Sequence, residues 1–163
     1  MIYGLPGDTL NGFYNSVDFA LKLYPNNLET FCLSVLPGTK LFDDASGFNL
    51  EFEEKAPYHI IKTPTFSESD LEKAGKLSKA CNYFYNDGRA VPWFNSVLRL
   101  FKMSPSVFLR EFSSWAENKH VYKDDGSDFI SIQKHQLEFL SDLCKKRSLL
   151  NYYQICQYIP SVS

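Results

Sequence analysis

Apolar residues recur at spacings of three and four along most of the chain, which is the spacing of one face of an α-helix. The first such stretch covers residues 10–24, and Pro25 closes it. The strongest stretch covers residues 67–86, and Asp87 with Gly88 ends it. We predict further helical segments over residues 40–45 (one or two turns), 92–102, from Ser104 and Pro105 onward, 129–146 and 149–159.

Hydrogen-bonding side chains mark two of the predicted helix starts. Asp8 or Thr9 is the expected N-cap of the helix over residues 10–24, since either side chain can accept a hydrogen bond from a free N–H group. Ser69 and Glu72 stand at the spacing of a capping box. These residues indicate where the first and the strongest helix begin.

Two apolar runs near the N-terminus depart from the helical pattern. Residues 1–3 form a short predicted strand, and residues 28–36 form a second strand that is almost continuously apolar. With the helix between them they predict a βαβ unit, whose strands normally lie in a parallel sheet covered on both faces. Two strands cannot make such a sheet. Either later strands complete it, or it lies in residues that this chain does not contain.

The predicted fold class is mainly α. We expect residues 1–50 to hold the βαβ unit and residues 51–163 to form a helical domain of about five helices. The segment over residues 48–58 is irregular and acidic, and its carboxylates favour a solvated loop over an acid–base pair. His59, which follows, could face a substrate pocket but is more typical of a structural or exposed histidine.

Composition narrows the classes of function. Of the 163 residues, 16% are aromatic, which indicates a well-filled core or a buried interface. The net charge of −2 gives no electrostatic reason to expect nucleic acid as a partner. No apolar run approaches the roughly 20 residues needed to span a bilayer, and no signal sequence is visible. We therefore predict a cytoplasmic protein.

The cysteines show no pattern of a metal site. They are Cys32, Cys81, Cys144 and Cys156, with no CxxC pair and no ligand spacing to the histidines. Each lies in an apolar setting, which predicts buried free thiols and argues against a disulfide framework. We predict no metal ligand and no catalytic residue in this chain.

The turns around the predicted βαβ helix carry a family resemblance. The chain reads IYGLPGDT over residues 2–9, before the helix, and LPGT over residues 36–39, where the second strand closes. This arrangement resembles the late strands, the fifth and sixth, of the partial (β/α) barrel of radical S-adenosylmethionine enzymes. Within that class it is similar to the cobalamin-binding branch of magnesium-protoporphyrin IX monomethyl ester oxidative cyclase-like proteins. The helical remainder is similar to an uncharacterised C-terminal domain of some of those proteins.

The resemblance implies four residues beside the adenine of S-adenosylmethionine. The family's fifth strand supplies an apolar residue and a glycine there, which by position are Ile2 and Gly4. The end of the sixth strand packs nearby, which implies Val35 and Leu36. A glycine lets the backbone approach a flat ring, and apolar side chains give the ring a dry face. Gly7 departs from a motif variant that has glutamate at this position.

The chemistry of that family needs residues that this sequence lacks. A CxxxCxxC loop holds its [4Fe–4S] cluster, and one open iron binds the amino and carboxylate groups of S-adenosylmethionine. Neither this loop nor a cobalamin-binding segment occurs here. The resemblance thus implies the C-terminal portion of an oxidoreductase, inert alone, whose parent protein uses S-adenosylmethionine, the cluster and, in this branch, cobalamin. Its partners would be the missing N-terminal barrel of the same polypeptide and a small-molecule substrate.

A second interpretation is a non-catalytic helical protein-interaction module with an incidental βαβ start. Its support is the aromatic content of the helices, which could form an exposed binding face. A self-sufficient module would be a compact monomer, whereas a barrel remnant would expose a strand edge and could form a homodimer through it. An independent small enzyme has the least support, because no catalytic constellation is visible.

Overall fold

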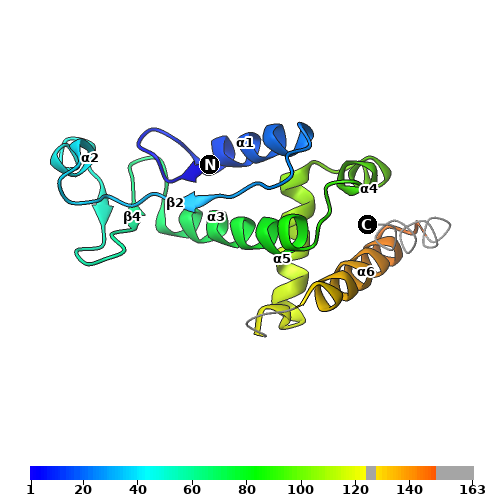
Figure 1. Ribbon diagram of the computed structural model, residues 1–163. Helices are drawn as coiled ribbons and strands as arrows, with labels where there is room; N and C mark the ends of the chain where they lie inside the picture. Colours follow the sequence, from blue (N-terminus) through cyan, green and yellow to red (C-terminus); the bar gives the residue numbers. More distant parts are fainter. Residues whose placement is uncertain (124–127, 150–163) are drawn as a thin grey trace.

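The computed structural model, which describes residues 1–123 and 128–149, begins with a parallel pair of short strands (Figure 1). These are β1 (Ile2–Tyr3) and β2 (Phe31–Cys32), and α1 (Leu10–Lys22) connects them. Thr9 is the N-cap of α1, because its side chain accepts a hydrogen bond from the N–H of Gly12. The predicted strand, helix, strand order is therefore present, and Thr9 is the cap among the two candidates.

The chain around β2 pairs with two partners in succession. Ile2 lies opposite Phe31 in the parallel register. Just beyond β2, an antiparallel bridge joins Ser34 to His59. The backbone N–H of Val35 donates to the Tyr58 carbonyl at 2.8 Å, and that of Ile60 donates to the Leu33 carbonyl at 2.9 Å. The apolar run over residues 28–36 thus changes its partner halfway, which is why β2 itself is shorter than the predicted strand.

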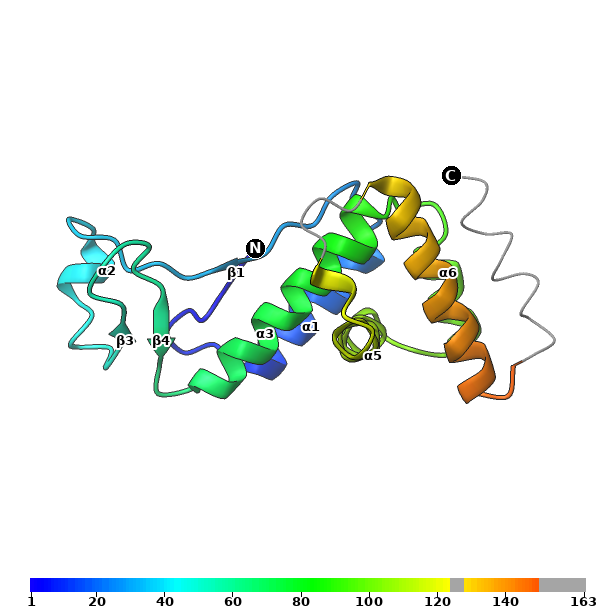
Figure 2. The same cartoon turned by 90° about the horizontal axis from the view of Figure 1, so that it is seen from below.

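A small lobe follows β2 and lies at one end of the molecule (Figures 1 and 2). It contains α2 (Lys40–Asp43) and the antiparallel pair of β3 (Glu51–Phe52) and β4 (Ile60–Lys62). The sequence predicted an irregular segment over residues 48–58, so the β3–β4 pair was not foreseen. Its strands are two and three residues long, too short to show an alternating pattern.

Longer helices make up most of the remaining described chain. They are α3 (Glu68–Cys81), α4 (Phe94–Phe101), α5 (Pro105–Asn118) and α6 (Phe129–Lys146), with a short 3-10 turn at Val121–Lys123. The mainly α fold class with a short N-terminal βα part is confirmed. Most of the helix predicted over 149–159 lies outside the described residues. Every helix of the described chain is too short or too polar to cross a bilayer.

The start of α3 corrects the predicted capping box. The box is formed by Ser67 and Asp70: each side chain bonds to the backbone N–H of the other. The prediction of Ser69 and Glu72 is wrong by two residues. Because the helix already begins at Glu68, Ser69 has helical backbone and cannot act as its N-cap.

A π-helical segment over Asn82–Asp87 continues α3. Its wide turn changes the hydrogen-bond pattern of the backbone carbonyls, and Gln136 of α6 reaches two carbonyls in this region. The Nε2 atom of Gln136 donates to the carbonyl oxygens of Phe84 at 2.8 Å and of Gly88 at 2.9 Å. Gln136 is 1% exposed, so these bonds form in the core. A Cβ atom at Gly88 would collide with the Gln136 amide, which explains the glycine there.

The core runs without a break from the strands to α6. α1 and α3 lie side by side, and α5 crosses them (Figure 2). The centre of the core is aromatic: the ring centroid of Phe84 lies 4.8 Å from that of Phe112 and 5.2 Å from that of Phe108. Residues from both sides of the predicted domain boundary share this core, and the boundary itself stays a prediction. Much of the high aromatic content therefore fills the interior.

Candidate functional site

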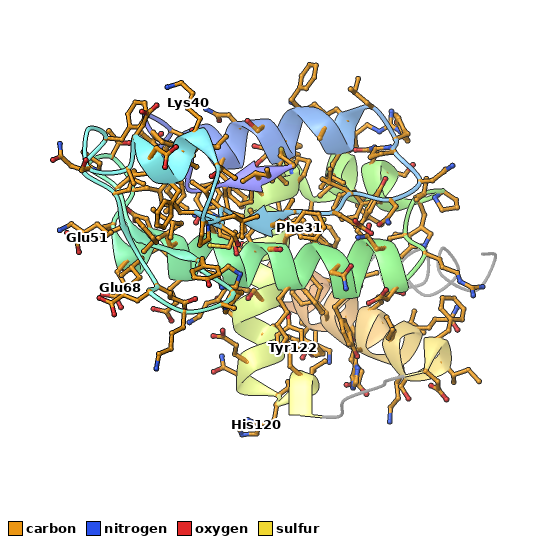
Figure 3. All side chains as sticks on the ribbon, turned by 60° about the vertical axis from the view of Figure 1, so that its left-hand side comes forward. Phe31, Lys40, Glu51, Glu68, His120 and Tyr122 are labelled. Atoms are coloured by element: carbon orange, nitrogen blue, oxygen red, sulfur yellow. The ribbon has the colours of Figure 1, made fainter. Side chains whose placement is uncertain are left out.

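The β1–β2 pair has one covered face and one exposed face. Tyr3 is 8% exposed, and its ring centroid lies 5.1 Å from that of Phe13 on α1. Side chains alternate along a strand, so Ile2 and Phe31 lie on the opposite face. They are 46% and 57% exposed, and Phe31 is labelled in Figure 3. Because Ile2 and Phe31 are partners in register, they form an adjacent apolar pair, which we call the Ile2–Phe31 face.

The four residues implied by the family resemblance have different environments. Ile2 and Leu36 are exposed, Leu36 by 48%. Val35 is fully buried and belongs to the core beneath the small lobe. Gly4 is also buried. Only Ile2 and Leu36 thus present apolar side-chain surface, and a role for all four beside an adenine stays a prediction.

Gly4 is required by the packing of the chain itself. Its φ of +85° lies in the left-handed region that favours glycine. A Cβ atom there would lie 2.8 Å from Cγ2 of Ile60 and 2.9 Å from Cδ2 of Leu71. These two side chains occupy the space on that side of the glycine. A flat ring could therefore approach the Gly4 backbone only from the opposite side.

Phe31 is the residue of this face that the sequence analysis did not select. It lies at the start of the apolar run over residues 28–36, where composition does not distinguish it from its neighbours. What distinguishes it is its parallel register with Ile2. Alternation along the run places residue 31 on the face of Leu33 and Val35, which are buried, so spacing alone could not have indicated an exposed Phe31.

A histidine and a carboxylate meet beside the Ser34–His59 bridge. The backbone N–H of His59 donates to Oε2 of Glu53 at 3.1 Å, and His59 Nδ1 lies 4.0 Å from the same oxygen. The backbone N–H of Glu53 in turn donates to the His59 carbonyl at 2.9 Å. Both side chains are nearly half exposed. Glu53, expected in a solvated loop, is partly exposed just after β3 and orients the backbone next to His59.

Tyr3 and Cys32 lie together on the covered face of β1 and β2. Burial, with smaller contributions from the neighbouring Cys32, raises the pKa of Tyr3 to about 12. Burial also raises the pKa of the Cys32 thiol. Both groups therefore stay protonated at neutral pH, and a protonated thiol is neither a good nucleophile nor a metal ligand.

The described cysteines do not form a cluster-binding site. Cys32 is half-buried, Cys81 and Cys144 are buried, and the three lie in separate elements. Within residues 1–123 and 128–149, no three His, Cys, Asp or Glu side chains are grouped so that they could hold a metal ion. An iron–sulfur cluster therefore does not fit the residues present in this part of the chain. Cys156 lies outside the described residues.

Comparisons with known proteins give one family and one named relative. The model of a family described as "Protein of unknown function (DUF4080)" matches residues 46–157. The chain is also similar to the oxygen-independent coproporphyrinogen III oxidase of Helicobacter pylori, with 33% identity over 95 residues. That alignment covers 49% of the chain and 21% of the relative, so the chain matches about a fifth of the relative's length. No solved structure matches the chain significantly.

Proposed function

We propose that this chain, which belongs to the DUF4080 family of proteins of unknown function, is the C-terminal portion of a radical S-adenosylmethionine oxidoreductase. The support from comparison is its similarity to oxygen-independent coproporphyrinogen III oxidase, an enzyme of the radical S-adenosylmethionine class. The support from sequence is the pair of turns that flank α1. The similarity and the two turns each cover only part of this chain, so the proposed activity is that of a longer protein.

The observation that carries the proposal is the geometry of the β1–α1–β2 unit. Parallel strands normally lie in large sheets covered on both faces. Here β1 pairs only with β2 among the described residues, and the Ile2–Phe31 face stays exposed. Leaving two large apolar side chains about half in water forfeits roughly 1 kcal/mol each, relative to full burial. The unit therefore has the form of a sheet fragment that further strands and a ligand would cover.

In the full protein this chain would supply one wall of the cofactor pocket. Ile2 and Phe31 would give the adenine a dry face, Leu36 would flank it, and the backbone at Gly4 and the buried Val35 would set the shape of that wall. The [4Fe–4S] cluster would come from the N-terminal barrel, since the described residues here hold no group of three possible metal ligands. Cobalamin and a cyclase-like reaction belong to the same proposal and rest on the resemblance alone.

The helical part has a place in the same proposal. α3 contacts both β2 and β4, so the helices hold the small lobe against the end of β2. We expect this part to shape the substrate side of the barrel. Deleting residues 51–163 from the full protein should therefore reduce turnover. Unchanged turnover would contradict this role.

The test uses the full-length gene product with its cluster reconstituted under anaerobic conditions. Binding of S-adenosylmethionine is measured by equilibrium dialysis for the wild type, Ile2→Asp and Phe31→Asp. Each variant should weaken binding at least about tenfold, because a carboxylate would replace apolar contact with the ring. Phe19→Asp is the matched control, since Phe19 is a 67% exposed phenylalanine on α1.

Two outcomes would contradict the proposal. One is a wild-type protein that binds no S-adenosylmethionine. The other is a loss in Phe19→Asp as large as in Phe31→Asp, which would show a general effect of a new charge. Circular dichroism of each variant separates a lost contact from a lost fold.

A further inference from the structure

A pocket of about 510 Å³ lies where the end of α1 meets α4 and the start of α5. These elements lie together at the end of the molecule opposite the small lobe (Figure 1). The pocket has three cationic side chains in its lining: Lys22, Arg99 and Lys102. They come from the last turn of α1, from α4 and from the left-handed residue that ends α4. We call it the α1–α4 pocket.

The three cations of this pocket have no carboxylate partner within the described chain. Elsewhere seven lysines and Arg147 pair with carboxylates. Arg99 donates only a long hydrogen bond of 3.4 Å to Ser96 on its own helix. Lys22 and Arg99 lie in the last turns of α1 and α4, where the helix dipole favours a cation, but no carboxylate of the described residues neutralises their charge. The whole chain has a net charge of −2, so this concentration of positive charge is local.

Neighbouring polar groups are already engaged and leave the cations free. Asp18, one turn before Lys22 on α1, accepts a hydrogen bond from the backbone N–H of Ser106 at 2.6 Å. Asn95 donates from Nδ2 to the carbonyl of Leu21 at 3.0 Å, which fixes α4 against α1. The relative positions of the cationic residues are thus set by contacts between the helices. The rest of the lining is largely apolar and includes Tyr24, Leu98, Met103 and Pro105.

We propose that the α1–α4 pocket binds a small molecule that carries a multivalent oxyanion, such as a phosphate or pyrophosphate group. The guanidinium of Arg99 can donate two parallel hydrogen bonds to such a group, and the two ammonium groups supply point charges. The apolar wall would hold the body of the ligand. The volume lies within the range of about 300–1,000 Å³ that small-molecule sites occupy.

The test measures inorganic pyrophosphate binding to the chain by calorimetry and by ¹H–¹⁵N chemical-shift changes at constant ionic strength. Wild-type protein should bind, with shifts confined to residues 22–24 and 95–106. Lys22→Glu/Lys102→Glu should weaken binding at least about tenfold, because two charge-assisted contacts are lost. The control is Lys55→Glu/Lys119→Glu, which makes the same change of net charge at two exposed lysines outside the pocket. It should bind within about twofold of the wild type.

Several results would overturn the proposal. They are the absence of pyrophosphate binding to the folded wild type, equal losses in the two double variants, and shifts spread over unrelated lysines. Co-sedimentation with phosphatidylglycerol vesicles without pyrophosphate binding would assign the cations to a lipid surface instead. If Lys22→Glu/Lys102→Glu unfolds, as judged by circular dichroism, Lys22→Gln/Lys102→Gln replaces it. This test is independent of S-adenosylmethionine, so its result does not depend on the proposed function.

Discussion

Asp18 of α1 caps a different helix, because its Oδ1 atom accepts a hydrogen bond of 2.6 Å from the backbone N–H of Ser106 in α5. The N-cap residue of α5 is Ser104, whose side chain makes no capping hydrogen bond. Ser106 is 3% exposed, so water cannot easily take the place of the carboxylate. The βαβ unit is therefore joined to the helical part by a polar contact as well as by the shared core.

We expect Asp18→Ala to lower the free energy of unfolding by about 1–2 kcal/mol, which is the usual effect of losing a helix cap. Urea unfolding followed by circular dichroism measures this change. Asp43→Ala is the control, because Asp43 is exposed on α2. A loss for Asp18→Ala no larger than that for Asp43→Ala would show that the cap contributes nothing.

Gly4→Ala should destabilise the chain more than Gly7→Ala. Both residues have positive φ, +85° and +82°, so alanine at either site costs about 1–2 kcal/mol of backbone strain. Only at Gly4 would the new Cβ also collide, with Ile60 and Leu71, whereas no atom lies within 4 Å of a Cβ at Gly7. We expect an extra loss of about 1–3 kcal/mol for Gly4→Ala. Equal losses in urea unfolding would contradict this packing role.

Gln136→Leu should cost about 2–3 kcal/mol, because it would leave the carbonyl oxygens of Phe84 and Gly88 without their side-chain donor in the core. Lys134→Leu, at an exposed position of the same helix, is the matched control. Hydrogen exchange of the amides in Asn82–Asp87 gives a second measurement. Faster exchange there in Gln136→Leu alone would locate the effect at the π-helix, and unchanged exchange would argue against it.

Stability should fall in alkaline solution through the buried tyrosine of the π-helix. Burial raises the pKa of Tyr85 from 10.0 to about 12, and its hydroxyl donates to the carbonyl of Pro25. Above pH 10 the unfolded state releases this proton while the folded state keeps it. The contribution of Tyr85 to the free energy of unfolding is therefore complete below pH 10 and is lost as the pH rises through about 12.

The measurement is the free energy of unfolding at several pH values across this window. Tyr85→Phe should be less stable at neutral pH, because the hydrogen bond is lost, and should show a shallower alkaline decline. Tyr24→Phe, at an exposed tyrosine, should keep the wild-type slope. Parallel curves for Tyr85→Phe and wild type would show that this phenol does not contribute.

Features set by local sequence were predictable. α6 was predicted at its observed bounds, and α1 ends two residues before its predicted limit, since apolar spacing and turn residues act within one helix. The capping box was placed two residues too late, because Ser67 and Ser69 are both competent caps. The β3–β4 pair was missed because it depends on contacts between residues about ten apart, such as Glu51 with Lys62.

The candidate sites depend on distant residues and were harder to predict. Ile2 was found through the family resemblance, but its partner Phe31 follows only from the register of β1 with β2. Lys22 lies far from Arg99 and Lys102 in the sequence, and all three line one pocket because α1 packs against α4 and α5, where Asn95 and Asp18 bond across the helices. No spacing along the chain could have indicated that pocket.

The succession of partners along the chain around β2 leaves its second edge available for pairing. β1 and then the segment around His59 bond to one edge, since the N–H of Leu33 donates to the Tyr3 carbonyl and the Leu33 carbonyl accepts from the N–H of Ile60. Among the described residues no strand pairs with the opposite edge of β2. A further strand parallel to β2 could therefore be added at that edge or on the far side of β1, whereas the small lobe ends the parallel pairing along the first edge at Ser34.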